Sequence, residues 1–185
     1  MNRILVLMAE GFEETELVVP FDILVRGGVK VTLAAINNDD GEVEGAHHLL
    51  MRADAKLSEI NLNDYNAVFL PGGGRGVDNL KHCEAVLDIV REFHEKKKWV
   101  TAICAAPAVL AAAGITFKHK ITSYPGMDAD LKKFCTAYLQ DRVVVDGNVV
   151  TSRGPGTAEE FGLKVLELLE GKEVADRVHD QMVCR

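Results

Sequence analysis

Short, continuous apolar runs alternate with segments of helical periodicity along this chain. We predict buried strands over residues 3–8, 30–36, 66–70 and 99–103, and helices over residues 15–25, 84–97, 107–113, 162–170 and 173–178. A strand followed by a helix and then a second strand implies parallel pairing with a right-handed crossover. Repeated along the chain, this order predicts a doubly wound α/β fold, in which helices cover both faces of a mostly parallel sheet.

Two stretches depart from this alternation. Residues 142–146 and 149–152 flank a Gly-Asn pair, which predicts a β-hairpin. Residues 37–45 are polar and rich in turn formers, and residues 47–52 are predicted to form a short edge strand. No linker or repeat interrupts the pattern, so residues 1–185 are expected to form a single domain.

The composition excludes several classes of protein. A net charge of -7 argues against non-specific binding to nucleic acid. The apolar run at residues 4–8 is short and is followed at once by glutamates, and no later stretch is long enough to span a bilayer, so we expect no contact with membranes. Four cysteines without paired spacing argue against a zinc site or a disulfide framework. We therefore predict a cytoplasmic protein without a bound metal.

Three motifs lie where predicted strands and their following segments meet: residues 10–16, 71–76 and 104–107. In doubly wound sheets, ligands bind at the carboxyl ends of the strands, near a topological switch point. These three motifs are therefore the candidates for a functional site.

Cys104 directly follows a buried strand and precedes a predicted helix. A strand-to-helix turn of this kind is sharp and strained, and it exposes its side chain above the sheet. The N-terminus of the following helix is expected to lower the pKa of the thiol and to favour the thiolate, which is both nucleophilic and oxidisable. The alternative is a buried structural cysteine. The remaining cysteines lack this context: Cys83, Cys135 and Cys184.

Residues 70–76 form a glycine-rich segment after another predicted strand. Glycines leave backbone N–H groups unobstructed, and such donors could stabilise an oxyanion formed when Cys104 attacks a carbonyl group. A tight turn without function explains the same glycines. The segment is neither a Walker loop nor a dinucleotide fingerprint, which argues against binding of phosphate or dinucleotides.

Charged residues accompany the other two strand ends. Glu13, Glu14 and Glu16 open the first predicted helix, where carboxylates suit the helix dipole without any function. One of them could also hydrogen-bond the cysteine or carry a proton, and the residues alone do not choose which. Arg153 could hold an anionic group, and its segment is equally typical of a rigid turn with an N-cap near Thr157.

Together these segments resemble the ThiJ/PfpI superfamily, especially its protein deglycase branch. The matching residues keep the family order and spacing: 9–16, 70–73, 102–107 and 151–157. The resemblance implies a flavodoxin-like fold, a homodimer, Cys104 as the reactive cysteine and Glu16 as the buried carboxyl that hydrogen-bonds its sulfur. It suggests the backbone N–H groups of Gly73 and Ala105 as the oxyanion site. The motifs also supply possible substrate contacts or supporting residues: Gly72, Tyr124, Arg153 and Pro155.

The chain departs from the family pattern at two positions. Tyr124 stands where many relatives carry histidine, and Ala105 follows the cysteine where the protease-like branch often has histidine. A phenol with a pKa near ~10 is a poor base at neutral pH, so a Cys–His–acid triad is disfavoured and a Cys–Glu pair remains. The other histidines are expected on the surface or as satisfied core residues: His47, His48, His82, His94, His119 and His179.

The resemblance implies a cysteine-dependent, glutathione-independent glyoxalase or deglycase, which converts methylglyoxal or its early adducts to a hydroxy acid. Slow turnover is expected without the histidine. The alternative is a redox-sensing, stress-protective chaperone that is switched by oxidation of Cys104. A flavin-binding module is disfavoured, because an acidic segment follows the first strand where a phosphate loop would be needed. The expected partners are a small reactive carbonyl compound and a second copy of the chain, and no cofactor is expected.

Overall fold

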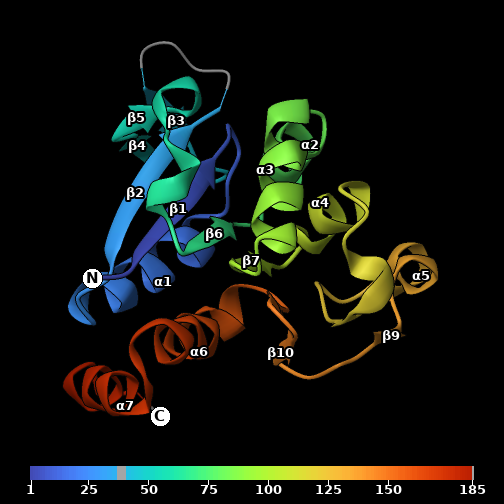
Figure 1. Ribbon diagram of the computed structural model, residues 1–185. Coiled ribbons are helices and arrows are strands. Elements are labelled where there is room, and N and C mark those ends of the chain that lie inside the picture. Colours follow the sequence, from blue (N-terminus) through green and yellow to red (C-terminus); the bar gives the residue numbers. More distant parts are fainter. Residues whose placement is uncertain (37–40, 185) are drawn as a thin grey trace.

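The computed structural model describes residues 1–36 and 41–184, and its centre is a seven-stranded sheet in the order β10-β11-β7-β6-β1-β2-β5 (Figure 1). The strands that run parallel are β1 (Arg3–Met8), β2 (Lys30–Ala35), β5 (Ala55–Lys56), β6 (Ala67–Leu70), β7 (Trp99–Ile103) and β11 (Val149–Ser152). At one edge, β10 (Val143–Asp146) pairs antiparallel with β11, which confirms the predicted hairpin. The mostly parallel sheet that we predicted is therefore present.

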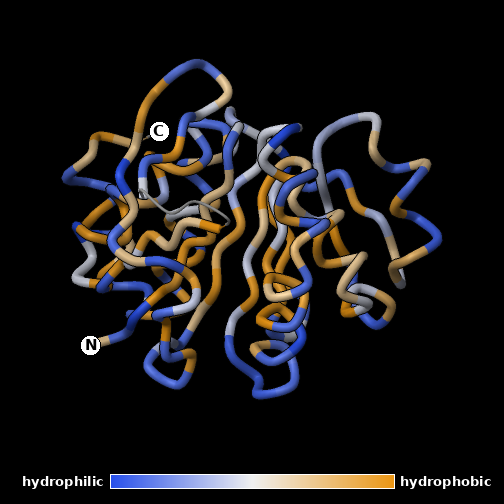
Figure 2. The backbone as a smooth tube through the Cα atoms, turned by 90° about the horizontal axis from the view of Figure 1, so that it is seen from above, coloured by the Kyte–Doolittle hydropathy of each residue, from blue (hydrophilic) through white to orange (hydrophobic). Residues whose placement is uncertain are grey.

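Helices cover both faces of this sheet (Figure 1). One face carries α1 (Glu14–Arg26), α6 (Ala158–Glu170) and α7 (Lys172–Gln181), and the other carries α2 (Gly74–Lys81), α3 (Glu84–Glu95) and α4 (Pro107–Ala112). Alternate side chains of β1 point to opposite faces of the sheet. Val6 packs in the core with α1 and α6, whereas Leu5 packs in the core with α3 and α4. Figure 2 shows the apolar strands in the interior and hydrophilic segments around them. The fold is a flavodoxin-like α/β sandwich with two cores.

Helix α6 begins four residues earlier than we predicted. The prediction began at residue 162, whereas the helix runs from Ala158, and both Ala158 and Phe161 are buried against the sheet. The Phe161 ring packs against Phe69 of β6 at 5.3 Å between ring centroids. The first turn of α6 therefore belongs to the core beneath the strand ends.

The predicted edge strand at residues 47–52 is wrong in place and in length. β4 (Leu50–Arg52) pairs antiparallel with β3 (Glu42–Glu44) in a separate ribbon, and β5 forms the edge of the main sheet. The ribbon is tied to the loop between β1 and α1, because the Ala46 N–H donates to the Phe12 carbonyl at 2.8 Å. That anchor holds residues 42–52 away from the sheet edge.

Several short elements were not expected from the sequence: α2, β8 (Lys120–Ile121), α5 (Asp128–Leu131), β9 (Ala137–Tyr138) and the 3₁₀ turns η1 (Leu57–Glu59), η2 (Leu62–Asp64), η3 (Thr116–Lys118), η4 (Lys132–Phe134) and η5 (Pro155–Thr157). Most are too short to show a hydrophobic period, and glycines obscure the period of α2. Of the polar stretch predicted at residues 37–45, residues 37–40 lie outside the described part of the chain. Among the described residues, no helix has the length and apolar character needed to cross a bilayer.

His119 is a satisfied core histidine, as expected. Its Nδ1 lies 2.9 Å from the Asp146 carbonyl oxygen, and its Nε2 lies 2.8 Å from Nε2 of His94. The ring is 8% exposed, and its contacts join α3 to the turn between β10 and β11. These bonds explain the histidine by packing alone.

Candidate active site

Cys104 occupies a strained turn at the carboxyl end of β7. Its φ is 64°, in the left-handed region that non-glycine residues adopt at a cost of about 1–2 kcal/mol. Two neighbouring segments hold the turn, since the Cys104 N–H donates to the Ser152 carbonyl at 3.0 Å and the Tyr124 N–H donates to the Cys104 carbonyl at 2.8 Å. The sharp, strained turn predicted from the sequence is confirmed. The predicted exposure of its side chain is wrong, because the ends of neighbouring strands cover Cys104 and leave the residue buried, at 9% exposed.

The surroundings of the sulfur raise the pKa of the Cys104 thiol. Burial and the Glu16 carboxyl both act in this direction, whereas the backbone N–H groups of Ala105 and Gly73 lower the pKa. The prediction that the following helix leaves the thiol with a low pKa is therefore wrong, because burial and a neighbouring carboxyl outweigh two N–H dipoles. Those two N–H groups nevertheless converge on the sulfur.

Glu16 is the acidic residue of the first helix that reaches the sulfur. The side chain is fully buried in the first turn of α1, and this burial is the main reason that its pKa is raised to about 7. Interactions with the Cys104 thiol and the Gly72 N–H lower the pKa, and the nearby charge of Glu13 raises it. Neither carboxyl oxygen completes a well-aligned hydrogen bond with any described residue. Because two neighbouring anions would repel each other in a buried site, the thiol is disfavoured from ionising while the Glu16 carboxyl is charged.

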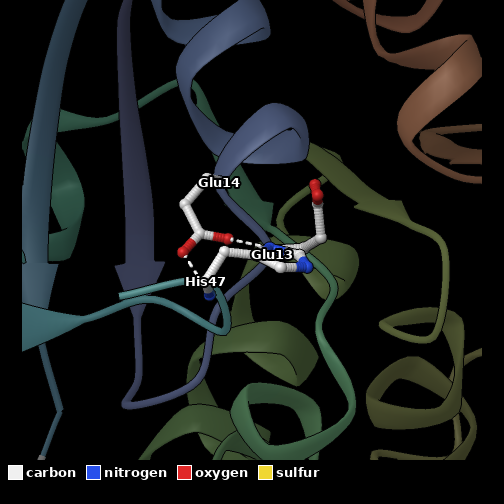
Figure 3. A group of neighbouring side chains, drawn as sticks. All are labelled: Glu13, Glu14 and His47. Atoms are coloured by element: carbon white, nitrogen blue, oxygen red, sulfur yellow. Dashed lines mark hydrogen bonds and ion pairs between the residues drawn. The ribbon is translucent and has the colours of Figure 1, made fainter. Parts of the chain in front are cut away.

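The other two glutamates of this segment have structural partners. Glu13 caps α1, and its Oε2 accepts the Glu16 N–H at 2.7 Å. Glu14 holds the ribbon, because its Oε1 accepts the His47 N–H at 2.6 Å and its Oε2 lies 2.7 Å from His47 Nδ1 (Figure 3). A β-carbon on Gly45 would lie 2.3 Å from the same Oε1, so a larger residue there would displace the carboxylate from its present position. Of the three glutamates that the sequence left as candidates, Glu16 is therefore the one beside the Cys104 thiol.

Among the described residues, Glu13, Glu14 and His47 form a group close enough to hold a metal ion (Figure 3), since one ligand atom from each lies within 4.8 Å of the others. The hydrogen bond with Glu14 raises the pKa of His47. The contacts between Glu14 and His47 attach the ribbon to α1, and the contact of Glu13 with the Glu16 N–H caps that helix. The group therefore has a structural role in this fold.

Gly72 makes room for both members of the Cys–Glu pair. A β-carbon at this position would lie 2.1 Å from Glu16 Oε2 and 2.7 Å from the Cys104 β-carbon. Gly72→Ala is therefore expected to destabilise the protein by about 1–3 kcal/mol, the usual cost of overpacking. Gly74→Ala in the same turn is the matched control, because its β-carbon would meet nothing within 4 Å. Urea unfolding checks the pair, and equal midpoints for the two variants would contradict the packing.

Tyr124, Arg153 and Pro155 meet at a cavity beside the pair. The cavity has a volume of about 340 Å³, and these three residues line it together with Gly154. A β-carbon on Gly154 would lie 3.2 Å from the Tyr124 ring and 3.8 Å from Glu16 Oε1. The backbone of Gly154 therefore lies between the Tyr124 ring and the buried Glu16 carboxyl, which places the cavity next to the Cys–Glu pair.

Sequence reasoning missed how the Arg153 turn is held. Thr157 precedes α6 as predicted, but its hydroxyl does not cap that helix. Its Oγ1 instead accepts the N–H groups of Gly154 at 3.0 Å and Arg153 at 3.2 Å, and it lies 2.7 Å from the Ser152 hydroxyl. The hydroxyl residues of the motif were a signal for such a network, but their partners depend on the fold of the turn.

Known proteins are similar to this chain in sequence and in architecture. A model described as the DJ-1/PfpI family matches residues 2–168. The chain is 37% identical to Parkinson disease protein 7 homolog of Danio rerio, over 100% of this chain and 98% of that protein. Among solved structures, Drosophila melanogaster DJ-1beta superimposes with a TM-score of 0.95 at 36% identity, covering 100% of this chain and 98% of that one. Toxoplasma gondii DJ-1, described as oxidized, superimposes with a TM-score of 0.92 at 30% identity, covering 100% and 99%. On this similarity over its whole length, the chain belongs to the DJ-1/PfpI family.

Proposed function

We propose that this protein is a slow, glutathione-independent glyoxalase or deglycase, which converts methylglyoxal or its early adducts to a hydroxy acid. Cys104 is the nucleophile, and Glu16 moves the protons. One observation carries this proposal: a thiol on a strained turn is paired with a buried carboxyl whose pKa is raised to about 7. A proton carrier works best when its pKa is near the working pH.

In the first step, the sulfur adds to the aldehyde carbon of methylglyoxal while the Glu16 carboxylate accepts the thiol proton. This transfer supplies a nucleophile from a thiol whose own pKa is raised. The backbone N–H groups of Gly73 and Ala105 donate to the carbonyl oxygen as it becomes negative. Glu16 then returns the proton to that oxygen, which leaves a hemithioacetal and an ionised carboxylate.

In the next steps, Glu16 removes the hydrogen from the former aldehyde carbon as a proton and delivers it to the neighbouring carbon. The proton of the hemithioacetal hydroxyl passes at the same time to the ketone oxygen. The carbon bonded to sulfur is thereby oxidised to a thioester, and the neighbouring ketone is reduced to an alcohol. Water hydrolyses the thioester, so that lactate leaves and the thiol is restored. Methylglyoxal and one water are consumed for each lactate formed, and no external oxidant is needed.

The proposal is tested by the pH dependence of lactate formation from methylglyoxal. Because Glu16 acts as a base in its ionised form, kcat/KM is expected to rise with pH through an inflection near 7 and then to level off. Glu16→Gln is expected to remove this inflection together with most of the activity. Failure of the pure protein to form lactate would refute the function, and an unchanged inflection in Glu16→Gln would refute the role of the carboxyl.

The same site supports a second candidate function, a redox sensor. When Glu16 is protonated, it can donate a hydrogen bond to a sulfinate on Cys104, and its carboxyl oxygens have no completed hydrogen bond in the reduced state that the structure describes. Two molecules of hydrogen peroxide convert the thiol to the sulfinate and leave two waters. A similar structure, that of Toxoplasma gondii DJ-1, is described as oxidized.

Mass spectrometry after mild peroxide treatment distinguishes this function. We expect Cys104 to gain two oxygen atoms before the half-buried thiols of Cys83 and Cys135 do. Earlier oxidation of either of those cysteines would exclude a sensor at Cys104. Glu16→Ala, which removes the hydrogen-bond donor, is expected to shift the product from sulfinate towards sulfonate.

We also propose a homodimer that is formed through α1 and the β3–β4 ribbon. Apolar side chains are exposed on these two elements, with Val18 at 39% and Val25 at 48% on α1 and Leu50 at 57% on the ribbon. Val18 and Val25 are seven residues apart and so lie on one side of the helix. Light scattering is expected to give twice the mass of the 20.2 kDa chain, and Val18→Lys is expected to give the monomer mass. A monomeric wild type would exclude this assembly.

A further inference from the structure

The cavity beside Tyr124 contains an arginine without an ion-pair partner in the part of the chain that the structure describes. The Arg153 guanidinium lines this cavity, and Nη1 donates to the Gln140 carbonyl at 2.9 Å. Among the described residues, no carboxylate lies within ion-pair distance of it. A guanidinium has five N–H donors in a planar fork, so one bond to a backbone carbonyl leaves donors for a ligand.

The second arginine of the cavity is already neutralised. Arg142 Nε lies 2.6 Å from Glu160 Oε2, and its Nη2 donates to the Gly156 carbonyl at 2.7 Å. The cavity therefore offers one net positive charge, which matches the single charge of a carboxylate. A phosphate dianion would need a second free cation.

The cavity lies next to the Cys–Glu pair, so a ligand held by the Arg153 charge would lie near that pair. Tyr124 and Gly154 are walls of the cavity, and both also adjoin the pair: the Tyr124 N–H donates to the Cys104 carbonyl, and the α-carbon of Gly154 lies beside the Glu16 carboxyl. The turn that carries Arg153 is fixed by the Thr157 hydroxyl, as described above. A rigid turn holds its cation in place before the ligand arrives, which reduces the cost of binding.

We infer that Arg153 forms a subsite for the carboxylate of an anionic substrate, so that the preferred substrates are α-oxoaldehydes that carry a carboxylate a few bonds from the reacting carbon. This inference rests on the proposed function for the identity of the reacting group. The anion itself is recognised by the arginine, independently of the chemistry at sulfur. A volume of about 340 Å³ suits a ligand of this size.

Direct binding tests the subsite without turnover. The probe is levulinate, a keto acid without an aldehyde, and its methyl ester is the neutral counterpart. By titration calorimetry, levulinate is expected to bind the wild-type protein about tenfold more tightly than the ester, as one charge-assisted contact would provide. Arg153→Gln is expected to abolish this preference, whereas Arg177→Gln, which removes an exposed arginine of α7 outside the cavity, is expected to retain it. Equal binding of acid and ester, or a preference that survives Arg153→Gln, would overturn the inference. Tighter binding of inorganic phosphate than of levulinate would overturn the assignment to a carboxylate.

Turnover separates this inference from the proposed function. With 4,5-dioxopentanoate and its methyl ester as substrates, we expect about a tenfold higher kcat/KM for the acid and loss of that ratio in Arg153→Gln. Lactate formation from methylglyoxal without any preference for the acid would support the proposed function and refute the subsite. Levulinate binding that depends on Arg153, in a protein that turns over neither dicarbonyl, would refute the proposed function and support the subsite.

Discussion

Cys104→Ala is expected to lower kcat/KM for methylglyoxal by about 10³-fold or more, down to the background rate. The reason is that Cys104 is the one thiol beside Glu16 in the part of the chain that the structure describes, so the covalent steps have no substitute. The measurement is lactate formation at pH 8, above the pKa of about 7 that we assign to the Glu16 carboxyl. The loss should appear in kcat, because the sulfur reacts and does not merely bind substrate.

A matched variant keeps this test specific. Cys83→Ala removes a half-buried thiol at the start of α3, which lines a different cavity. This variant is expected to retain wild-type activity. Both variants should unfold at temperatures close to that of the wild type, because each loses only one sulfur atom. If Cys104→Ala retained more than about a tenth of the wild-type activity, covalent catalysis at this residue would be excluded.

Glu16→Gln is expected to stabilise the protein at pH 8 and to leave its stability nearly unchanged at pH 4. The folded state raises the pKa of this carboxyl from 4.5 to about 7, so it binds the proton more tightly than the unfolded chain does. The stabilisation from that proton is present below pH 4.5 and is lost as the pH rises through about 7. A shift of this size corresponds to about 3 kcal/mol for a fully coupled buried group, and glutamine avoids the loss because it carries no charge.

Urea unfolding at several pH values checks this prediction. The difference in unfolding free energy between Glu16→Gln and the wild type should grow with pH between 4.5 and about 7 and then remain constant. Glu173→Gln removes an exposed carboxylate from the first turn of α7 and serves as the control for net charge. A difference that is independent of pH would show that Glu16 does not titrate in this range.

The sequence is enough to predict the strands and helices that form the two cores. β1 and β7 have the predicted limits because each is a short apolar run with polar or glycine-rich flanks. The β3–β4 ribbon escaped prediction because its place depends on bonds to the loop after β1, and these involve residues far apart in the sequence. Local sequence patterns do not predict such long-range contacts.

At the candidate site, too, local features were predictable from the sequence and long-range contacts were not. The position of Cys104 after β7 follows from the strand pattern, and the choice of Glu16 over its acidic neighbours needed the resemblance or the structure. The pKa of the thiol was predicted in the wrong direction, because burial and the facing carboxyl arise only when β7 and α1 come together. The cavity at Arg153 also depends on the fold, since its walls come from three separate stretches of the chain: 124–125, 140–142 and 153–157.

The left-handed backbone at Cys104 has a consequence for the origin of its reactivity. A free peptide with the sequence of residues 101–107 would avoid this conformation, because a β-carbon disfavours it. The hydrogen bonds of Cys104 with Ser152 and Tyr124 impose it, and they form only when the ends of the sheet are assembled. An electrophile that labels the folded protein selectively should therefore show no selectivity for this cysteine in a tryptic digest.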